Sequence, residues 1–365
     1  MRIAFHAPLK PPDHPVPSGD RQIARLLIDA LRAAGHQVEI ASRLRTREPA
    51  GDRARQAELT EQAAGEIARL LDLYRTAPPD LWFTYHLYYK APDLVGPAVC
   101  KALNIPYVVV EASHAARRMQ GPWGDFAERA RSAMASADAV IALNRSDLAG
   151  LAGTVPTERL HHLHPFMRCR ARPPVRRGNS GPVRLLAIGM MRGGDKLQSY
   201  RALARALRRP GLTNWRLTIV GDGPEALQVR AAFQPVREWV AWTGALPPSH
   251  LARVIRRHDL MVWPAVNEAF GMALVEASCL GLPILAGATG GVPDVVRHGR
   301  TGILVPPQHD HAMHRAIADL VRHPRLRHRF ADAAWRRASR VHAFEGAVRQ
   351  LDAIVRNLEV ASCGS

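Results

Sequence analysis

Apolar residues in the first half of the chain fall into short runs that alternate with stretches of helical periodicity. Residues 1–7 form the first run, and residues 21–35 place apolar side chains three and four positions apart until Gly35 ends the pattern. We expect further buried strands at 36–42, 80–86, 106–113 and 137–144, and the plainest helices at 56–74 and 125–136. This alternation is typical of a parallel sheet whose strands are joined by crossover helices.

The second half repeats this alternation after a break. Residues 166–182 are rich in Pro, Gly and Arg and lack apolar periodicity, which predicts an interdomain linker. Further apolar runs follow at 183–189, 215–221, 240–244, 260–265, 282–287 and 302–307. The predicted fold class is therefore α/β, with doubly wound, Rossmann-like domains over residues 1–165 and 183–342. Because open parallel sheets bind ligands at the carboxyl ends of their strands, we expect the domains to face one another across a binding cleft.

Length and composition narrow the class of protein. A chain of 365 residues exceeds what one hydrophobic core usually organises, and its apolar runs are too short to span a bilayer. The N-terminal run predicts a strand rather than a secretory signal, so we expect a cytoplasmic protein. The cysteines are scattered and form no C-x-x-C motif, which predicts reduced thiols, no disulfide framework and no metal site. They are Cys100, Cys169, Cys279 and Cys363.

The chain is strongly basic, with a net charge of +18 that comes almost entirely from arginine. Such a charge favours anionic partners, among them a lipid-linked phosphate, an acidic polysaccharide or the inner face of a membrane. Compositional bias explains it equally well, because arginine is used throughout the chain, and peripheral contact with an anionic membrane stays open. Nucleic acid is an improbable partner, since no nucleic-acid-binding module accompanies the charge and aromatic residues make up only 6% of the chain.

Two carboxylates carry the strongest chemical signal. Glu268 and Glu276 bracket Gly271, and we expect a helix to begin near Phe270. Free N–H groups from Ala269 to Met272 would then favour a phosphate, and the glycine would let it approach the backbone. Each carboxylate accepts hydrogen bonds and could hold a pair of sugar or ribose hydroxyls. An ordinary loop and helix with solvent-facing acids is the alternative for this segment taken alone.

The surrounding segments resemble glycosyltransferase family 4. The Glu, Gly and Glu pattern is followed by a Gly-Leu-Pro turn, a Gly-Gly-x-Pro-Asp segment and a Thr-Gly-x-Leu-Val-Pro-Pro segment, and it is preceded by VGDGPE and WTGAL. These lie at 281–283, 290–294, 301–307, 220–225 and 242–246. The resemblance implies the two-domain GT-B fold, retention of anomeric configuration and a UDP- or GDP-sugar donor. It also implies that a final helix, about 343–365, packs back on the first domain.

The same resemblance assigns a phosphate-binding loop after the first strand of the second domain. Gly189 and Lys196 match the family, whereas Met190 follows the glycine and the available arginine is Arg192, so the loop is a variant. An Arg and a Lys can neutralise a departing diphosphate without a divalent ion. We therefore expect neither a metal nor a cofactor beside the donor.

The resemblance also assigns the nucleotide. It places Gly221 in a turn near the nucleotide, although this glycine is equally well explained as structural. Backbone groups around Gly244 and Ala245 would contact the base, which leaves uracil and guanine undistinguished.

The first domain matches less closely. Gly19 corresponds to a glycine loop that lets the donor phosphate or the acceptor approach. Family members often carry a histidine where this chain has Ala112, and Glu111 and His114 flank that position. Either could contact the transferred sugar, and a carboxylate there would suit a nucleophile or a charge stabiliser. His86, at a strand end, could line the acceptor side.

These observations predict a metal-independent, retaining hexosyltransferase. Its donor would be a nucleotide-diphosphate sugar, and its acceptor a glycan, a lipid-linked sugar or a small molecule, with a role in cell-envelope glycan or glycolipid synthesis. Two alternatives stay open: a non-catalytic protein that binds nucleotides or anionic glycans, and a nucleotide-sugar epimerase of the same architecture. A phosphorylase is disfavoured, because Lys196 is the only lysine beyond residue 101 and no lysine is left for pyridoxal phosphate.

Overall fold

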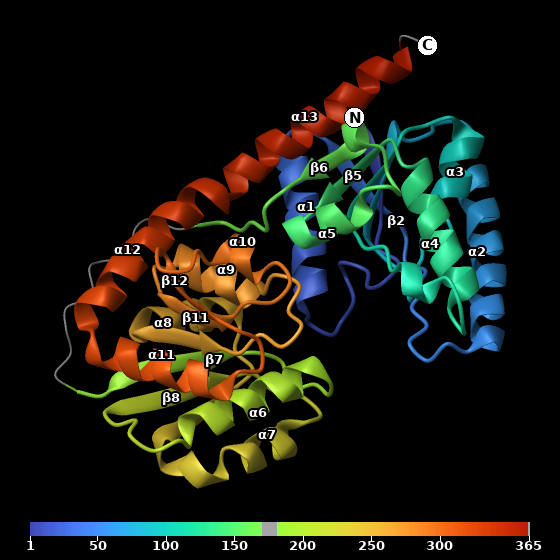
Figure 1. Cartoon of the computed structure of the whole chain (residues 1–365). Helices are drawn as coiled ribbons and strands as arrows, with labels where there is room; N and C mark the ends of the chain where they lie inside the picture. Colours follow the sequence, from blue (N-terminus) through green and yellow to red (C-terminus); the bar gives the residue numbers. More distant parts are fainter. Residues whose placement is uncertain (170–180, 364–365) are drawn as a thin grey trace. The chain divides into compact units, whose positions relative to one another are not determined.

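The computed structural model describes residues 1–169 and 181–363, which form two compact units. The first unit comprises Met1–His164 and Glu345–Ser365, and the second comprises Pro165–Phe344. Each unit has one parallel sheet with helices around it (Figure 1). Residues 170–180 of the expected linker lie outside the described residues.

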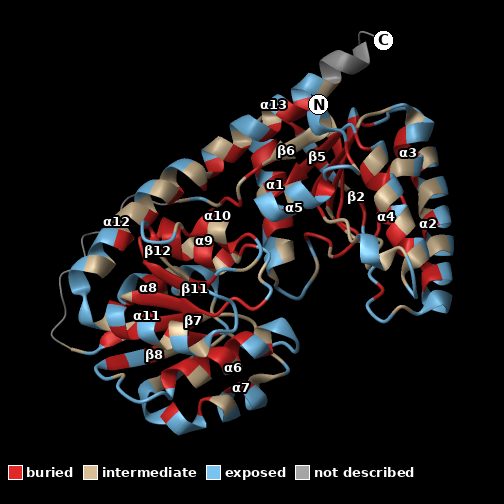
Figure 2. Cartoon of the chain, in the orientation of Figure 1, coloured by how far each residue is buried: buried red, intermediate tan, exposed pale blue. Residues whose placement is uncertain are grey.

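The sheet of the first unit has six parallel strands in the order β2-β1-β3-β4-β5-β6. The strands are β1 (Arg2–His6), β2 (Gln37–Ser42), β3 (Leu81–Leu87), β4 (Tyr107–Ala112), β5 (Ala139–Ala142) and β6 (Leu160–His162). The central strands are buried along nearly their whole length, which is why they appear in the sequence as continuous apolar runs (Figure 2). β6 lacks such a run, and the sequence pattern missed it.

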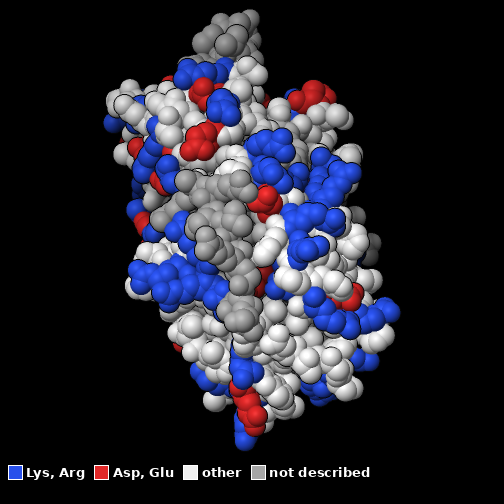
Figure 3. Space-filling view, turned by 90° about the vertical axis from the view of Figure 1, so that its left-hand side faces the viewer, with Lys and Arg blue, Asp and Glu red and all other residues white. Residues whose placement is uncertain are grey.

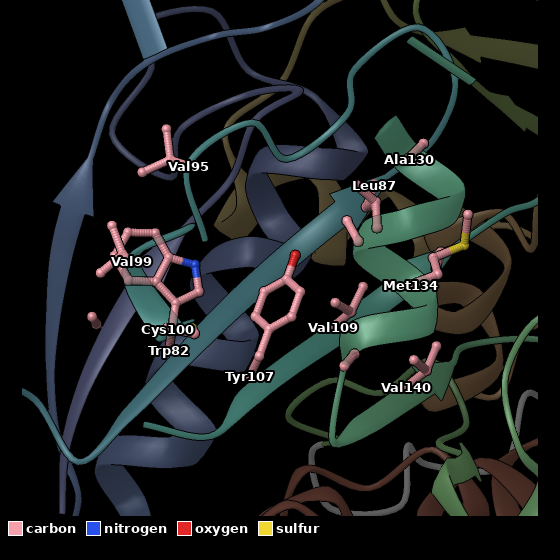
Figure 4. Packing of buried hydrophobic residues seen from close by; sticks show 14 of the residues in the cluster. Trp82, Leu87, Val95, Val99, Cys100, Tyr107, Val109, Ala130, Met134 and Val140 are labelled. Carbon is pink, nitrogen blue, oxygen red and sulfur yellow. The ribbon is translucent and has the colours of Figure 1, made fainter. Parts of the chain in front are cut away.

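Helices cover this sheet on both faces. They are α1 (Gly19–Ala33), α2 (Arg53–Leu73), α3 (Gly96–Leu103), α4 (Gly124–Ser136) and α5 (Arg145–Leu151), with single 3₁₀ turns at Ala116–Arg118 and Thr157–Arg159. One face of the core joins Trp82 of β3 and Tyr107 of β4 to Val99 of α3 and Met134 of α4 (Figure 4). The final helix, α13 (Phe344–Cys363), begins in the second unit, and its remaining residues belong to the first.

The second unit repeats the architecture with six parallel strands in the order β12-β11-β10-β7-β8-β9. Its strands are β7 (Val183–Ile188), β8 (Trp215–Val220), β9 (Val240–Gly244), β10 (Leu260–Trp263), β11 (Ile284–Gly287) and β12 (Gly302–Val305). Its helices are α6 (Asp195–Leu207), α7 (Ala226–Ala232), α8 (Pro248–Arg257), α9 (Met272–Cys279), α10 (Val292–Val295), α11 (Asp310–Arg322) and α12 (Pro324–Val341), with a 3₁₀ helix at Gln234–Trp239.

Both sheets reverse their strand order at one point, and this fixes where ligands are expected. In the first unit the chain runs outward from β1 to β2 and then crosses back to β3. In the second unit it runs outward from β7 through β8 and β9 and then crosses back to β10. Crevices at the carboxyl ends of such strand pairs are the usual ligand sites of open α/β sheets.

The expectation that the cysteines are reduced and form no disulfide was wrong. Cys169 and Cys279 form a disulfide, with Cα atoms 5.0 Å apart, although 110 residues separate them in the sequence. A long-range pair leaves no local spacing signal, so the absence of a C-x-x-C motif could not exclude it. Cys100 is a free, buried thiol. None of the described helices is both long enough and apolar enough to cross a membrane.

Candidate functional site

A partly buried ion pair lies at the strand-order reversal of the second unit. Glu268 follows β10, and its Oε2 atom lies 2.5 Å from Nζ of Lys196 on α6. Trp263, at the end of β10, donates its indole N–H to the same oxygen at 3.1 Å. The lysine ammonium also lies 5.3 Å from the centre of that indole ring. Only 14% of the glutamate side chain and 26% of the lysine side chain are exposed, so the pair is largely shielded from water.

The loop that carries Glu268 has an unfavourable backbone conformation. Ala265 and Asn267 have φ angles of 54° and 50°, and left-handed conformations cost non-glycine residues on the order of 1–3 kcal/mol each. Hydrogen bonds from neighbouring elements hold the loop. Ser199 accepts the N–H of residue 266 at 3.0 Å, and the Asn267 amide donates to Asp195 at 2.8 Å. Thr289 accepts the N–H of Glu268 at 3.3 Å and donates to the Ala265 carbonyl. This clamp fixes the position of the carboxylate.

Glycines keep the backbone around this pair closely packed. A Cβ atom on Gly290 would lie 2.2 Å from the carbonyl oxygen of Glu268, which explains the Gly-Gly turn after β11. A Cβ on Gly221 would lie 1.9 Å from the carbonyl oxygen of Gly189, and one on Gly189 would lie 2.8 Å from the Trp263 ring. Gly189 and Gly221 therefore let two strand-end loops run side by side next to the ion pair.

The N-terminus of α9 lies in the same region. Gly271 precedes the helix with a φ of 72°, and its carbonyl accepts the N–H groups of Leu274 and Val275. The preceding N–H groups of such a helix have no intrahelical partner and can bind an anion. The helix begins at Met272, slightly later than the sequence predicted.

Glu276 lies in the second turn of α9, as the spacing predicted. Burial raises the pKa of its carboxyl group to about 7. A carboxyl group of this kind gains a negative charge readily once a ligand donates hydrogen bonds to it.

Other predicted donor residues are distributed around this centre. Ala269 is exposed, whereas Phe270 and Met272 are buried. Gly244, at the end of β9, accepts a hydrogen bond from the N–H of Gly221, and Ala245 is exposed beside it. Arg192 is exposed in the loop before α6 and is not joined by a hydrogen bond to the carboxylate of Glu268 within the described residues. Trp263 was not predicted, because a tryptophan inside an apolar strand resembles a core residue.

The first unit has a second polar cluster at its own strand-order reversal. His86, near the end of β3, places Nδ1 3.2 Å from Oδ1 of Asp20 on α1 and 4.0 Å from Oε2 of Glu111 on β4. His86 and Glu111 have φ angles of 63° and 58°, a conformation that costs each of them on the order of 1–3 kcal/mol. The Oε2 atom of Glu111 is buried and makes no hydrogen bond within the residues that the structure describes.

Burial and the opposite charges of His86 and Glu111 shift the pKa values of both side chains. Burial lowers the pKa of His86, but the negative charges of Glu111 and Asp20 outweigh it and raise the pKa to about 9. Burial raises the pKa of Glu111 to about 7 against the opposing charge of His86. A buried carboxylate and an imidazolium thus face one another at the edge where a ligand is expected.

Gly19 and His114 are the other residues of the first domain that the sequence predicted for the site. Gly19 is the first residue of α1, and the space where its Cβ would lie is open. His114 lies beyond the end of β4 and is partly exposed, and within the described residues no hydrogen bond or ion pair joins it to His86 or Glu111. Asp20 directly follows Gly19 in the sequence but was not predicted, because only the fold brings it to His86.

A family model described as Glycosyl transferases group 1 matches residues 196–337, which lie in the second unit. The chain is 30% identical to the D-inositol 3-phosphate glycosyltransferase of Streptomyces coelicolor over 50% of this chain and 45% of that protein. It is 25% identical to the alpha-D-kanosaminyltransferase of Streptomyces kanamyceticus over 75% of this chain and 74% of that protein. The proteins that this chain resembles in sequence are thus glycosyltransferases. The first of these alignments covers less than half of the related protein.

Solved structures share the fold. Sucrose-phosphate synthase from Thermosynechococcus elongatus superposes with a TM-score of 0.78 at 19% identity, covering 99% of this chain and 100% of that one. HepE from Anabaena, in complex with UDP, gives 0.76 at 16% identity, covering 98% of this chain and 100% of that one. The predicted GT-B class, with two Rossmann-like units, is therefore confirmed.

Proposed function

We propose that this protein is a retaining glycosyltransferase that transfers a hexosyl group from a UDP- or GDP-sugar to an acceptor hydroxyl. The observation that carries the proposal is the Lys196–Glu268 pair beside the N-terminus of α9. It lies at the strand-order reversal of the unit that matches the group 1 glycosyl transferase model.

The donor diphosphate would bind where positive charge already exists. Free N–H groups at the start of α9 and the Lys196 ammonium would contact its oxygens, and the exposed Arg192 has the freedom to join them. As Lys196 turns to the phosphate, Glu268 is released from its ion pair. Its carboxylate can then accept hydrogen bonds from hydroxyls of the transferred sugar.

The contacts with the ribose and the base are assigned from the positions of the residues around the ion pair. Glu276 would accept hydrogen bonds from the ribose hydroxyls, and the glycine-lined loops at Gly189 and Gly221 would admit the nucleotide close to the backbone. The strand end at Gly244 and Ala245 would contact the base. The bound UDP of HepE supports a nucleotide of this class, and the choice between UDP and GDP is part of the test.

The proposed reaction needs no base from the protein. The bond from the anomeric carbon to the diphosphate breaks first, and the departing phosphate oxygen takes the proton of the acceptor hydroxyl as the new bond forms on the same face. Lys196 and Arg192 stabilise the negative charge that develops on the leaving group, so no divalent ion is required. We assign Glu111 and His86 to contacts with the transferred sugar or the acceptor.

A thermal-shift panel tests the donor site. UDP, GDP, ADP and their sugar derivatives are added to the protein with and without EDTA, because a ligand that binds the native state raises the apparent melting temperature. We expect one nucleotide to stabilise the protein, and EDTA to leave the shift unchanged. The absence of any shift would contradict the proposal, and a shift that EDTA removes would contradict its metal independence.

A further inference from the structure

A line of aromatic rings extends from the first-unit cluster. The ring of His86 lies 5.4 Å from that of Tyr88, which lies 5.5 Å from Tyr89, which in turn lies 5.7 Å from Trp123. Paired hydrogen bonds between Tyr88 and Ala91 close a tight turn that fixes the tyrosines. The Trp123 indole is fixed by its N–H, which donates to the Glu48 carbonyl at 3.2 Å. The rings are partly exposed and preorganised.

Two cations lie against these rings. Nζ of Lys90 is 4.8 Å from the centre of Trp123 and 5.7 Å from that of Tyr89. The Arg118 guanidinium carbon is 5.3 Å from the centre of Tyr89 and 5.4 Å from that of Trp123. Both rings therefore hold both cations in place.

Neither cation is neutralised. Within the described residues, Lys90 and Arg118 form no ion pair with a carboxylate, and the Nε atom of Arg118 is buried without a hydrogen-bond partner. Two arginines of α2 differ, since Arg55 and Arg69 pair with glutamates one turn away. The face of the molecule in Figure 3 mixes signs, with Lys and Arg in several separate groups and acidic residues among them. Lys90 and Arg118 thus concentrate uncompensated positive charge on an aromatic surface.

The position of this surface connects it with the expected site. Tyr88 to Lys90 follow the end of β3, and the segment that carries Arg118 and Trp123 follows the end of β4. His86 and Glu111 lie at the same strand ends. A ligand that contacts the polar cluster can therefore extend over the rings.

We propose that Tyr89, Trp123, Lys90 and Arg118 form a binding surface for an acceptor saccharide that carries a negative charge. This rests on the proposed function, because it names the acceptor class of that enzyme. Aromatic rings bind the apolar faces of sugar rings, and a guanidinium and an ammonium bind a carboxylate or a phosphate.

Calorimetry on the full chain tests the surface separately from catalysis. The probes are trigalacturonic acid and its neutral methyl ester, which share one carbohydrate skeleton, with glucose 6-phosphate and glucose as the phosphate pair. The variant R118Q/K90Q removes both cations of the surface. The control R55Q/R75Q removes two exposed cations elsewhere in the unit, one within α2 and one just after its end. Nucleotide binding is measured on every variant.

We expect an acidic probe to bind at least roughly tenfold more tightly than its neutral partner, and R118Q/K90Q to lose that difference while R55Q/R75Q keeps it. Equal affinity for acidic and neutral probes, or equal loss in the control, overturns the proposal. If neither acidic probe binds while nucleotide still binds, the proposed saccharide surface is overturned and the proposed function is not affected. Binding of an acidic probe without any nucleotide binding supports the surface and contradicts the proposed function.

Discussion

Lys196 and Glu268 neutralise one another across 2.5 Å at the strand-order reversal of the second unit. The pair leaves neither charge without a partner in a position that is largely shielded from water. A diphosphate can replace the carboxylate as the partner of the lysine, and the freed carboxylate can then accept hydrogen bonds from sugar hydroxyls.

Replacement of this lysine should weaken nucleotide binding. We expect Lys196→Met to lower the affinity for the preferred nucleoside diphosphate roughly ten- to a hundredfold, because a charge-assisted contact to phosphate is lost. Isothermal titration calorimetry measures the effect. Lys101→Met, which removes an exposed lysine from α3, is the matched control. Equal affinity of Lys196→Met and wild type would remove Lys196 from the donor site.

Nucleotide binding should depend on pH through Glu276. Burial raises the pKa of this carboxyl group to about 7 in the free protein, while hydrogen bonds from ribose favour its charged form. Binding therefore releases a proton, so the affinity should rise as the pH increases from 6 to 7 and level off above 8. Nucleotide affinity is measured for wild type and Glu276→Gln across this pH range. The nucleotide phosphate titrates in both experiments, so the difference between the two profiles is the contribution of Glu276. Identical profiles in the two proteins would show that Glu276 does not contact the ligand.

The first-unit cluster makes a separate pH prediction. The positive charge of His86 opposes the effect of burial on Glu111, whose pKa is raised to about 7. Replacing the imidazolium by a neutral group removes that opposition, so His86→Gln should move the Glu111 titration to higher pH. We expect the acidic limb of the kcat/KM profile to shift upward in His86→Gln and to vanish in Glu111→Gln. An unshifted limb in His86→Gln would show that the two groups are not coupled.

Reduction of the Cys169–Cys279 disulfide should destabilise the protein. The bond closes a sequence separation of 110 residues, and disulfides typically contribute about 2–4 kcal/mol by restricting the unfolded chain. We expect a reductant to lower the melting temperature by roughly 5–15 °C, as measured by calorimetry. The variant Cys169→Ser/Cys279→Ser should melt at the lower temperature whether or not the reductant is present. A wild-type transition insensitive to reductant would contradict the disulfide.

Apolar periodicity predicted most of the fold because both sheets are parallel and buried on both faces. Strands such as β3 and β4 therefore appear as continuous apolar runs, whereas the partly exposed β6 has no such pattern. The Cys169–Cys279 bond was unpredictable for a related reason, since it depends on tertiary proximity rather than on spacing.

The part of the candidate site that lies within one short segment of the sequence was predictable. Glu268, Gly271 and Glu276 lie within nine residues, and their spacing alone placed both carboxylates about one helix N-terminus. The Lys196 contact required the fold, because it joins residues 72 positions apart. Left-handed backbone at His86 and Glu111 also required it, since only tertiary contacts can hold these residue types in that conformation.

Transfer itself is the most direct test of the central claim. The protein is incubated in EDTA with the nucleotide sugar that stabilises it and with the tightest-binding saccharide, and the product is analysed by NMR. We predict a new glycosidic bond with the anomeric configuration of the donor, and an activity roughly 10²–10³-fold lower in Glu268→Ala, with Glu238→Ala as an exposed control on the same unit. A product of inverted configuration would contradict the retaining mechanism, and wild-type activity in Glu268→Ala would contradict the site.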